Sequence, residues 1–357
     1  MWIRAVIIFF ITITCSLFLT PQVRRLALRF HIIEKSDSRK VHKRVITCLG
    51  GVAIYLAFII GLICGYFLIP KTLISSYLHY SAALISGGTI IFILGVYDDI
   101  KEANARTKIS WQVIAAFVTI SVFNIRITYF TLPVLGRVEL GILSIPFTLM
   151  WVMGITNAIN WIDGLDGLAA GVSSIACIAL SIISWRGGGM ICGFITIALL
   201  GSILGFLRYN FYPAKVFMGD GGSNFLGFIL ANVAIIGSLK SATLASLAVP
   251  ILILGIPVFD TLFSVLRRIY LKRSPIMPDR DHLHFRLIKL GFSHQQSVLI
   301  IYLVSLILSI CAILLSESSS LTSLSLVVLV VGFLGIIAWR AGLLSISFRG
   351  RKMKSRG

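Results

Sequence analysis

Four polar segments interrupt an otherwise strongly apolar chain of 357 residues, and each carries side chains that could do chemistry. The first segment, residues 95–100 (GVYDDI), contains the adjacent Asp98 and Asp99, and Lys108 follows ten positions after the first aspartate. Two neighbouring carboxylates repel each other, so one takes a raised pKa or both face cations. This segment alone fits a pair of catalytic acids and an ordinary solvated loop pair equally well.

The second segment, residues 157–167 (NAINWIDGLDG), joins two apolar runs. Asn157, Asn160 and Asp163 recur every three positions, so they share one face if a helix continues that far. Gly164 would let the backbone approach a ligand closely. Amide and carboxylate oxygens suit Mg²⁺ or Mn²⁺. The alternative, a polar helix cap, is less favoured because a cap rarely needs so many polar side chains.

The third segment, residues 210–223 (NFYPAKVFMGDGGS), places glycines around Asp220 and a serine, Ser223, at the expected start of a helix. Such a backbone can surround a phosphate group at a helix N-terminus, and Asp220 could bind a metal ion. A simple turn followed by an N-cap is the competing interpretation.

The fourth segment, residues 278–286 (PDRDHLHFR), carries His282 and His284 between two arginines, Arg280 and Arg286. Arginine binds phosphate oxygens through its planar fork, and histidine is an adjustable donor, so the segment suits diphosphate recognition. Zinc is a weaker alternative, because two histidines without a nearby cysteine supply too few of the usual ligands.

The elements that position these segments must lie in a membrane. Hydrophobic residues make up 57% of the chain, charged residues only 13%, and the mean hydropathy is +0.97. This composition strongly disfavours a soluble protein. Apolar blocks of roughly 17 to 25 residues match the length of a membrane-spanning helix, and lipid leaves backbone groups no other partner. Eleven blocks are expected, at residues 4–20, 48–68, 82–97, 111–127, 143–160, 167–185, 190–207, 222–239, 244–266, 297–316 and 321–340.

The predicted fold class is thus an all-α polytopic membrane protein, with one transmembrane catalytic domain over residues 1–340 and a basic cytoplasmic tail over 341–357. The first block is predicted to be a retained anchor and not a signal peptide, because its basic residues follow the apolar run. The six cysteines lie in or beside apolar blocks without metal-binding spacing and are expected to be small core residues. Cytoplasmic loops are predicted at 21–47, 98–110, 208–221 and 267–296.

The charge distribution sets the predicted orientation. The net charge is +19, and the loops on one side of an eleven-helix arrangement hold 26 of the 32 Lys and Arg residues. Because the cytoplasmic side carries the Lys/Arg excess, the N-terminus is expected outside and the C-terminus in the cytoplasm, and nucleic acid is not needed to explain the charge. Eleven of the 13 acidic residues fall on the same side. A site for a metal ion and a polyphosphate is therefore expected at the cytoplasmic face.

Taken together, the four segments resemble the polyprenyl-phosphate N-acetylhexosamine-1-phosphate transferases of glycosyltransferase family 4. Their motifs occur here in family order over roughly residues 35–295. The resemblance implies a multi-pass enzyme of the bacterial inner membrane whose active site faces the cytoplasm. It would move a sugar 1-phosphate from a UDP-amino sugar to undecaprenyl phosphate, release UMP and begin cell-surface polysaccharide synthesis. N-acetylglucosamine is the expected sugar, Mg²⁺ or alternatively Mn²⁺ the cofactor, and membrane lipids and a second copy of the chain are further expected partners.

The resemblance also implies roles for particular residues. Catalytic roles fall on Asp98, Asp99 and His282, and the metal ligands would be Asn160 and Asp220. Substrate binding would involve Lys108, Asn157, Asp163, Gly164, Leu165, Asp166, Asn210, Phe217, Arg280 and His284, with Phe217 stacking on uracil. The sequence departs from the family pattern at Phe285, where relatives carry a third histidine, and in residues 39–47, where Val45 and Thr47 replace two prolines.

The expected mechanism is direct attack of the lipid phosphate on the phosphorus next to the sugar, with a covalent aspartyl route left open. An ion-coupled transporter is the alternative from another class. Its acidic residues should lie near the bilayer midplane, often at broken helices of an inverted repeat. Here the acids cluster at predicted cytoplasmic helix ends and no internal repeat is visible, which favours the enzyme.

Overall fold

The computed structural model describes residues 1–32, 46–132, 136–238, 248–272, 281–317, 321–340 and 342. The predicted tail therefore falls almost wholly outside the described residues. The longer helices are α1 (Trp2–Arg29), α2 (Gly50–Leu68), α3 (Ile74–Lys101), α4 (Ala105–Ser121), α5 (Ser144–Ile162), α6 (Leu168–Arg186), α7 (Met190–Asn210), α8 (Gly219–Ser238), α10 (Gly255–Tyr270), α12 (His294–Glu317) and α13 (Leu321–Arg340). Two short helices, α9 (Ala248–Ile253) and α11 (Leu283–Lys289), complete the set together with two single turns, η1 (Lys71–Leu73) and η2 (Gly141–Leu143).

Helices occupy all eleven segments in which the sequence predicts them, but not all meet the requirements of a membrane span. Within the described residues, eight helices are long and apolar enough to cross a bilayer: α1, α2, α3 with η1, α5 with η2, α6, α7, α8 and α12. The chain is thus a multi-pass, helical membrane protein with eight candidate spans.

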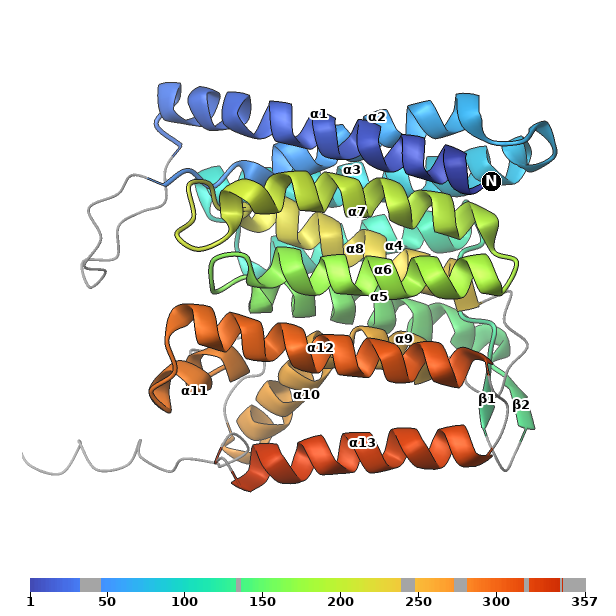
Figure 1. The fold of residues 1–357 in the computed structure, drawn as a ribbon, viewed down its shortest axis with the longest axis vertical. Helices are drawn as coiled ribbons and strands as arrows, with labels where there is room; N and C mark the ends of the chain where they lie inside the picture. The colour runs from blue at the N-terminus through green and yellow to red at the C-terminus, as the bar shows by residue number, and fades with distance from the viewer. Residues whose placement is uncertain are drawn as a thin grey trace, which may run out of the picture.

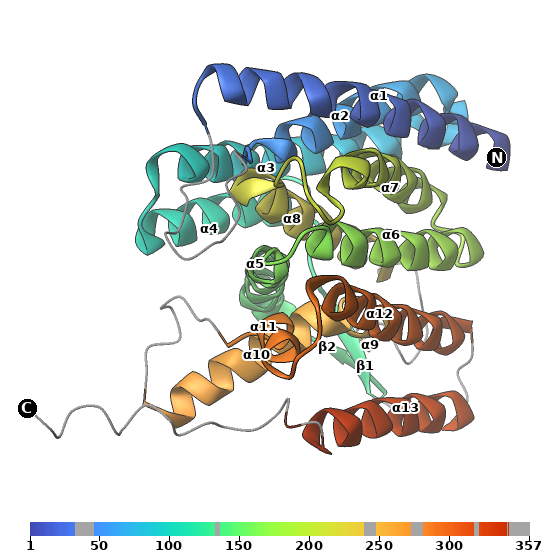
Figure 2. The same ribbon diagram turned by 60° about the vertical axis from the view of Figure 1, so that its left-hand side comes forward.

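The segment predicted as one helix over residues 244–266 is divided in the structure. Helix α9 ends at Ile253, and α10 begins at Gly255. Pro250 and Pro257 lie on either side of this break, and each lacks the backbone N–H that a continuous helix needs. Helix α10 consequently runs obliquely to the other helices (Figure 2). It contacts the histidine segment and α11 through Asp260, Phe263 and Arg267.

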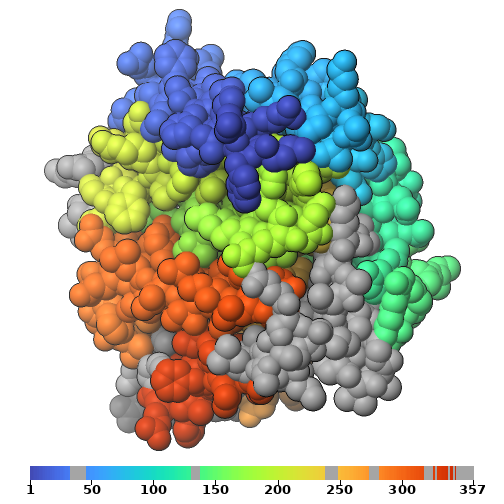
Figure 3. Space-filling model, turned by 45° about the vertical axis from the view of Figure 1, so that its right-hand side comes forward, coloured from blue at the N-terminus to red at the C-terminus, as the bar shows by residue number. Residues whose placement is uncertain are grey.

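Helix α8 forms the centre of the bundle and packs against α2, α3, α5 and α7. Its side chains from Phe225 to Ile236 are almost completely buried. On one side, α7 packs against α1 and α6, and α12 packs against α6 and α9. In the space-filling view, the N-terminal residues (blue) and the C-terminal residues (orange and red) form opposite parts of the visible face, with the middle of the chain between them (Figure 3).

A small β-hairpin, which the sequence did not predict, connects α4 to α5. Strands β1 (Tyr129–Leu132) and β2 (Gly136–Glu139) are antiparallel, with Tyr129 opposite Glu139. The guanidinium of Arg137 lies 3.8 Å from the ring centroid of Tyr129. The hairpin and the N-terminus lie at the end of the bundle opposite to α11 (Figure 1). The described residues of the four polar segments gather at the α11 end (Figure 1).

Candidate active site

Asp99 binds the first turn of the central helix α8. Its two carboxylate oxygens accept hydrogen bonds from the backbone N–H groups of Asp220, at 2.7 Å, and Gly221, at 3.0 Å. Backbone N–H groups at a helix start have no partner within the helix, so an acceptor there stabilises it. Gly219 has a φ of +75°, and a Cβ at this position would lie 2.0 Å from the carbonyl oxygen of Cys48. Asp99 and the glycines therefore fix the position of Asp220.

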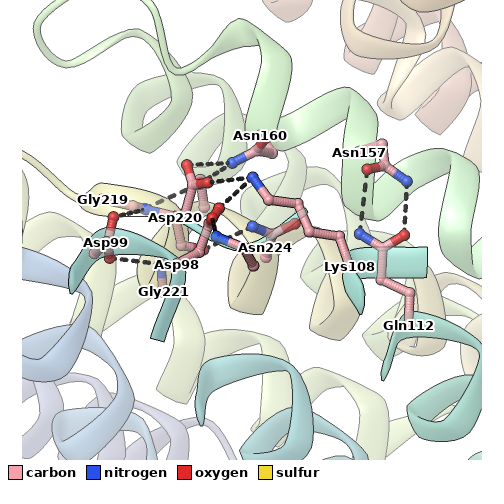
Figure 4. Close-up of polar contacts among 12 residues, drawn as sticks. Asp98, Asp99, Lys108, Gln112, Asn157, Asn160, Gly219, Asp220, Gly221 and Asn224 are labelled. Carbon is pink, nitrogen blue, oxygen red and sulfur yellow. Dashed lines mark hydrogen bonds and ion pairs between the residues drawn. The ribbon is translucent and has the colours of Figure 1, made fainter. Parts of the chain in front are cut away.

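Lys108 lies between two carboxylates that are 122 positions apart in the chain. Its ammonium forms ion pairs with Asp98 and with Asp220, the latter at 3.3 Å (Figure 4). The other oxygen of Asp98 accepts a hydrogen bond from the backbone N–H of Ala103 at 2.7 Å. The structure thus brings together the first and third polar segments around one positive charge.

Asn160, from the second segment, joins the same cluster. Its amide nitrogen donates to Asp220 Oδ1 and to Ser223 Oγ, both at 2.9 Å (Figure 4). The ends of α3, α4, α5 and α8 therefore contribute Asp98, Lys108, Asn160 and Asp220 to one cluster, which we call the carboxylate cluster. Carboxylate and amide oxygens in this number suit a hard divalent cation, so its donor set fits Mg²⁺.

Asn157 lies one helical turn before Asn160 but has different partners. Its amide exchanges two hydrogen bonds with Gln112 of α4, at 2.9 and 3.2 Å, and also donates to the carbonyl oxygen of Met153 at 2.7 Å (Figure 4). This reciprocal pair links α4 to α5. Gln112 is a residue that the sequence interpretation missed, because an isolated glutamine in an apolar helix carries no motif.

Asp166 and Asn210 hold the second and third polar segments together. Asp166 Oδ2 accepts from the backbone N–H of Ala214 at 2.9 Å, and its own N–H donates to His294 Nε2 at 2.9 Å. Asn210 accepts from the N–H of Gly167 at 3.1 Å and donates to the carbonyl of Val216 at 3.0 Å. His294, at the start of α12, was not singled out from the sequence.

The backbone of Phe217 is held on both sides by the segment that precedes α2. Its N–H donates to the carbonyl of Thr47 at 2.8 Å, and its carbonyl accepts from the N–H of Gly50 at 2.9 Å. Its side chain is half-buried, whereas Leu165, on the opposing loop, belongs to the buried core. The Phe217 ring is thus attached to a rigid backbone close to Asp220 in sequence.

Asp163 directly follows the last residue of α5 and lies between Asn160 and Asp166 in the sequence. Burial, together with the nearby charges of Asp220 and Asp166, raises the pKa of its carboxyl to about 7. Among the described residues, no hydrogen-bond donor engages this carboxyl. Asp163 is therefore a polar group whose proton occupancy changes close to neutral pH.

His282 and His284 of the fourth segment lie at the start of α11. The rings stack with centroids 6.0 Å apart. His284 Nε2 is buried and has no hydrogen-bond partner among the described residues, and a Cβ at Gly164 would lie 2.3 Å from it. Burial lowers the pKa of His284 to about 4, so its ring is neutral at pH 7. Arg280, the remaining predicted residue, lies outside the described residues.

A buried acid of α10, Asp260, was missed by the sequence interpretation of the site. Its Oδ2 lies 2.9 Å from His282 Nδ1, and its Oδ1 accepts from the backbone N–H of Leu283 at 2.8 Å. A lone carboxyl inside a predicted apolar block was the available signal. The contact itself depends on the break between α9 and α10, which brings α10 beside α11.

Fold and site together define a multi-pass membrane protein whose polar cluster is built from the ends of its helices. The model of the glycosyl transferase family 4 matches residues 81–238, which include the carboxylate cluster. Over 97% of its length the chain is 38% identical to the "Probable undecaprenyl-phosphate N-acetylglucosaminyl 1-phosphate transferase" of Bacillus subtilis, covering 95% of that protein. The chain therefore belongs to glycosyl transferase family 4.

Other relatives are similar to this chain at lower identity. A decaprenyl-phosphate N-acetylglucosaminephosphotransferase of Mycolicibacterium smegmatis is 32% identical over 80% of this chain and 76% of the relative. An undecaprenyl-phosphate alpha-N-acetylglucosaminyl 1-phosphate transferase of Salmonella typhi is 28% identical over 80% of this chain and 77% of the relative.

Proposed function

We propose that this protein transfers N-acetylglucosamine 1-phosphate from UDP-N-acetylglucosamine to undecaprenyl phosphate, with release of UMP, as the first membrane step of cell-surface polysaccharide synthesis. The names of its relatives describe this activity on undecaprenyl or decaprenyl phosphate. The observation that carries the proposal is the carboxylate cluster, because Asp98, Lys108, Asn160 and Asp220 meet beside a glycine-rich helix start. Such a cluster can stabilise the negative charge of a reacting diphosphate.

Asn160 and Asp220 would hold a divalent metal ion, with Mg²⁺ expected and Mn²⁺ an alternative. The cluster already accommodates one positive charge, the Lys108 ammonium, between Asp98 and Asp220. When bound, the metal ion would neutralise charge on the diphosphate oxygens. Ser223, which accepts from Asn160, would orient that amide.

The reaction forms a bond between an oxygen of the lipid phosphate and the phosphorus that carries the sugar. The bond between that phosphorus and the bridging oxygen breaks, and the bridging oxygen leaves with UMP. Asp98 would take the proton of the acceptor phosphate or orient that group, with Lys108 neutralising the charge beside it. Asp99 would act by holding Asp220 in place, since its oxygens bind the α8 backbone.

The donor would bind on the loops that join the second and third polar segments. Phe217 would stack on the uracil ring, and the backbone around Gly164, Leu165 and Asp166 would surround it. The hydrogen bonds of Asp166 and Asn210 support this pocket because they fix both loops. His282, with Arg280 preceding it in the sequence, would contact the diphosphate.

The active site would face the cytoplasm of a bacterial cell, where nucleotide sugars are made. In the predicted arrangement of eleven spans, 26 of the 32 Lys and Arg residues lie on one side, and this asymmetry supports the orientation. The whole of residues 1–340 would then act as one catalytic domain in the inner membrane, with the basic tail near anionic lipid headgroups. A homodimer is a further expectation.

The sugar can be tested with purified protein, undecaprenyl phosphate, Mg²⁺ and a panel of UDP-sugars. N-acetylglucosamine is expected to give the highest kcat/KM, with N-acetylgalactosamine and a 6-deoxy amino sugar as comparisons. A higher kcat/KM for another sugar would overturn the assignment of the donor. Conversion of none of them would overturn the proposed reaction.

A further inference from the structure

We infer that Asp260 is a positioning residue for His282, holding its imidazole with the proton on Nδ1 so that Nε2 is the ring nitrogen available to substrate. The inference rests on the proposed function only in giving His282 a place beside the diphosphate. The geometry of the pair itself requires no substrate.

The Asp260 carboxylate contacts two groups at the start of α11. Its side chain is only 5% exposed, and it lies on α10, a different element from its partners. Oδ2 is 2.9 Å from His282 Nδ1, and Oδ1 accepts from the backbone N–H of Leu283 at 2.8 Å. One carboxylate therefore fixes both the helix start and the ring.

The direction of the ring contact follows from chemistry. An ionised carboxylate only accepts hydrogen bonds, so His282 Nδ1 must donate and must carry a proton. In the neutral ring the second nitrogen, Nε2, is then unprotonated. An acceptor that binds the N–H of one ring nitrogen leaves the other nitrogen unprotonated and able to accept a hydrogen bond. Carboxylates that accept from metal-bound or catalytic histidines act in the same way. Among the described residues, no side chain engages Nε2 of His282.

Neighbouring aromatic groups restrict the orientation of the ring further. The ring of Trp161, on the last turn of α5, has its centroid 5.9 Å from that of His282, and the His284 ring stacks at 6.0 Å with an interplanar angle of 3°. Since Trp161 follows Asn160 directly, His282 lies next to the helix end that supplies the carboxylate cluster. The ring is therefore held beside the proposed site by contacts on its edge and its faces.

Asp281, the residue before His282, has different partners from Asp260. The Asp281 carboxylate pairs with Arg267, with Arg286 at 2.9 Å and with Lys289 at 2.7 Å. These ion pairs attach α11 to α10 and to its own C-terminal residues. Loss of the Asp281 charge would loosen α11 without changing the hydrogen bond to His282 Nδ1, which makes Asp281→Asn the matched control.

The test uses Asp260→Asn, which keeps the shape of the side chain. The carboxamide oxygen can still accept from Leu283, but its NH₂ group would face Nδ1 and force this nitrogen to accept. The proton should therefore move to Nε2, as in the Asp-to-Asn exchange of a serine protease triad. ¹⁵N spectra of histidine-labelled full-length protein in detergent at pH 8, assigned with His282→Gln, report which nitrogen is protonated.

We expect Nδ1–H in the wild-type protein and in Asp281→Asn, and Nε2–H in Asp260→Asn. Transfer activity of Asp260→Asn should fall on the order of 10- to 100-fold in kcat. In a protein that already carries His282→Gln, adding Asp260→Asn should cause no further loss of kcat, because Asp260 acts on the reaction only by positioning His282. Nε2–H in the wild-type protein, or equal losses in both backgrounds, would overturn the inference.

This outcome is separable from the proposed reaction. The wild-type spectrum needs no substrate, so it decides the tautomer even if Asp260→Asn does not fold. Absence of sugar-phosphate transfer by the wild-type protein would instead count against the proposed function alone.

Discussion

Two adjacent aspartates at the end of α3 have different partners, and for this reason we propose different roles for them. Asp98 faces Lys108, whereas both oxygens of Asp99 bind backbone N–H groups of α8. The sequence predicted catalytic roles for both aspartates but could not distinguish them, because they have the same side chain and are adjacent in the chain. The distinction arises from packing of α8, whose first turn lies more than 120 positions further along the chain.

Exchanging each aspartate for asparagine should therefore give different results. Asp98→Asn removes the proposed base, so kcat should fall about 10²- to 10⁴-fold. Its loss of stability should be the smaller of the two, because the carboxamide oxygen can still accept from the N–H of Ala103 and only the ion pair with Lys108 is lost. Asp99→Asn puts an NH₂ group against backbone donors and should lower the free energy of unfolding by about 1–3 kcal/mol. Transfer kinetics and thermal unfolding in detergent measure both. Equal effects of the two exchanges on stability and on kcat would contradict the division of roles.

The buried His284 predicts how the stability of the protein depends on pH. Its pKa is lowered from the ordinary 6.5 to about 4 in the folded protein, chiefly by burial. Between these values the unfolded chain binds a proton that the folded protein does not, so the free energy of unfolding should fall as pH decreases from about 6.5 to about 4. Above this window the ring is neutral in both states and makes no contribution.

Thermal unfolding in detergent at several pH values checks this expectation. His284→Gln should flatten the decrease, while His79→Gln, at an exposed position, controls for the loss of one histidine. An unchanged decrease in the His284→Gln protein would show that another group is responsible.

At the level of helices, the close approach of α3 and α8 positions the carboxylate cluster. A Cβ at Gly95 would lie 2.4 Å from the Cα of Gly221 and 2.5 Å from the carbonyl oxygen of Asp220. Both neighbours are backbone atoms, which cannot rotate away. Only glycine therefore allows the two helices to approach so closely that Asp99 reaches the first turn of α8.

Gly95→Ala should push α3 and α8 apart. We expect loss of about 1–3 kcal/mol in the free energy of unfolding and a large loss of transfer activity, because Asp98 and Asp220 lie at this contact. Gly154→Ala on α5 is the matched control, since a Cβ there has nothing within 4 Å. Thermal unfolding and kinetics of the two variants should therefore diverge, and similar behaviour would argue against the close contact.

Hydropathy predicted the helices well because the length of a span is imposed by the bilayer. The predicted block 321–340 coincides with α13, and the block 190–207 lies within α7. The division at Leu254 and the hairpin at residues 129–139 were not predicted, because turns of this kind depend on a few proline and glycine positions and on packing. Asp260 was missed as a site residue for the same reason, since only the divided helix places it beside His282.

The proposed orientation of the whole molecule rests on the charge asymmetry of its sequence. Lys71 and Lys101 are exposed residues at the two ends of one candidate span, which runs from Lys71 to Lys101. A membrane-impermeant thiol reagent added to intact cells should label Lys71→Cys and not Lys101→Cys, because the loop at 98–110 is predicted in the cytoplasm. Permeabilised cells provide the control. Labelling of Lys101→Cys in intact cells would reverse the proposed orientation.

The proposed reaction is defined by which bond of the donor is broken. UDP-N-acetylglucosamine labelled with ³²P at the phosphorus next to the sugar, incubated with the protein, undecaprenyl phosphate and Mg²⁺, answers this directly. We expect the label to enter an organic-soluble lipid in an amount equal to the UMP released, and we expect Asp220→Ala to prevent both. Release of labelled UDP, with an unlabelled sugar on the lipid, would contradict the proposed reaction.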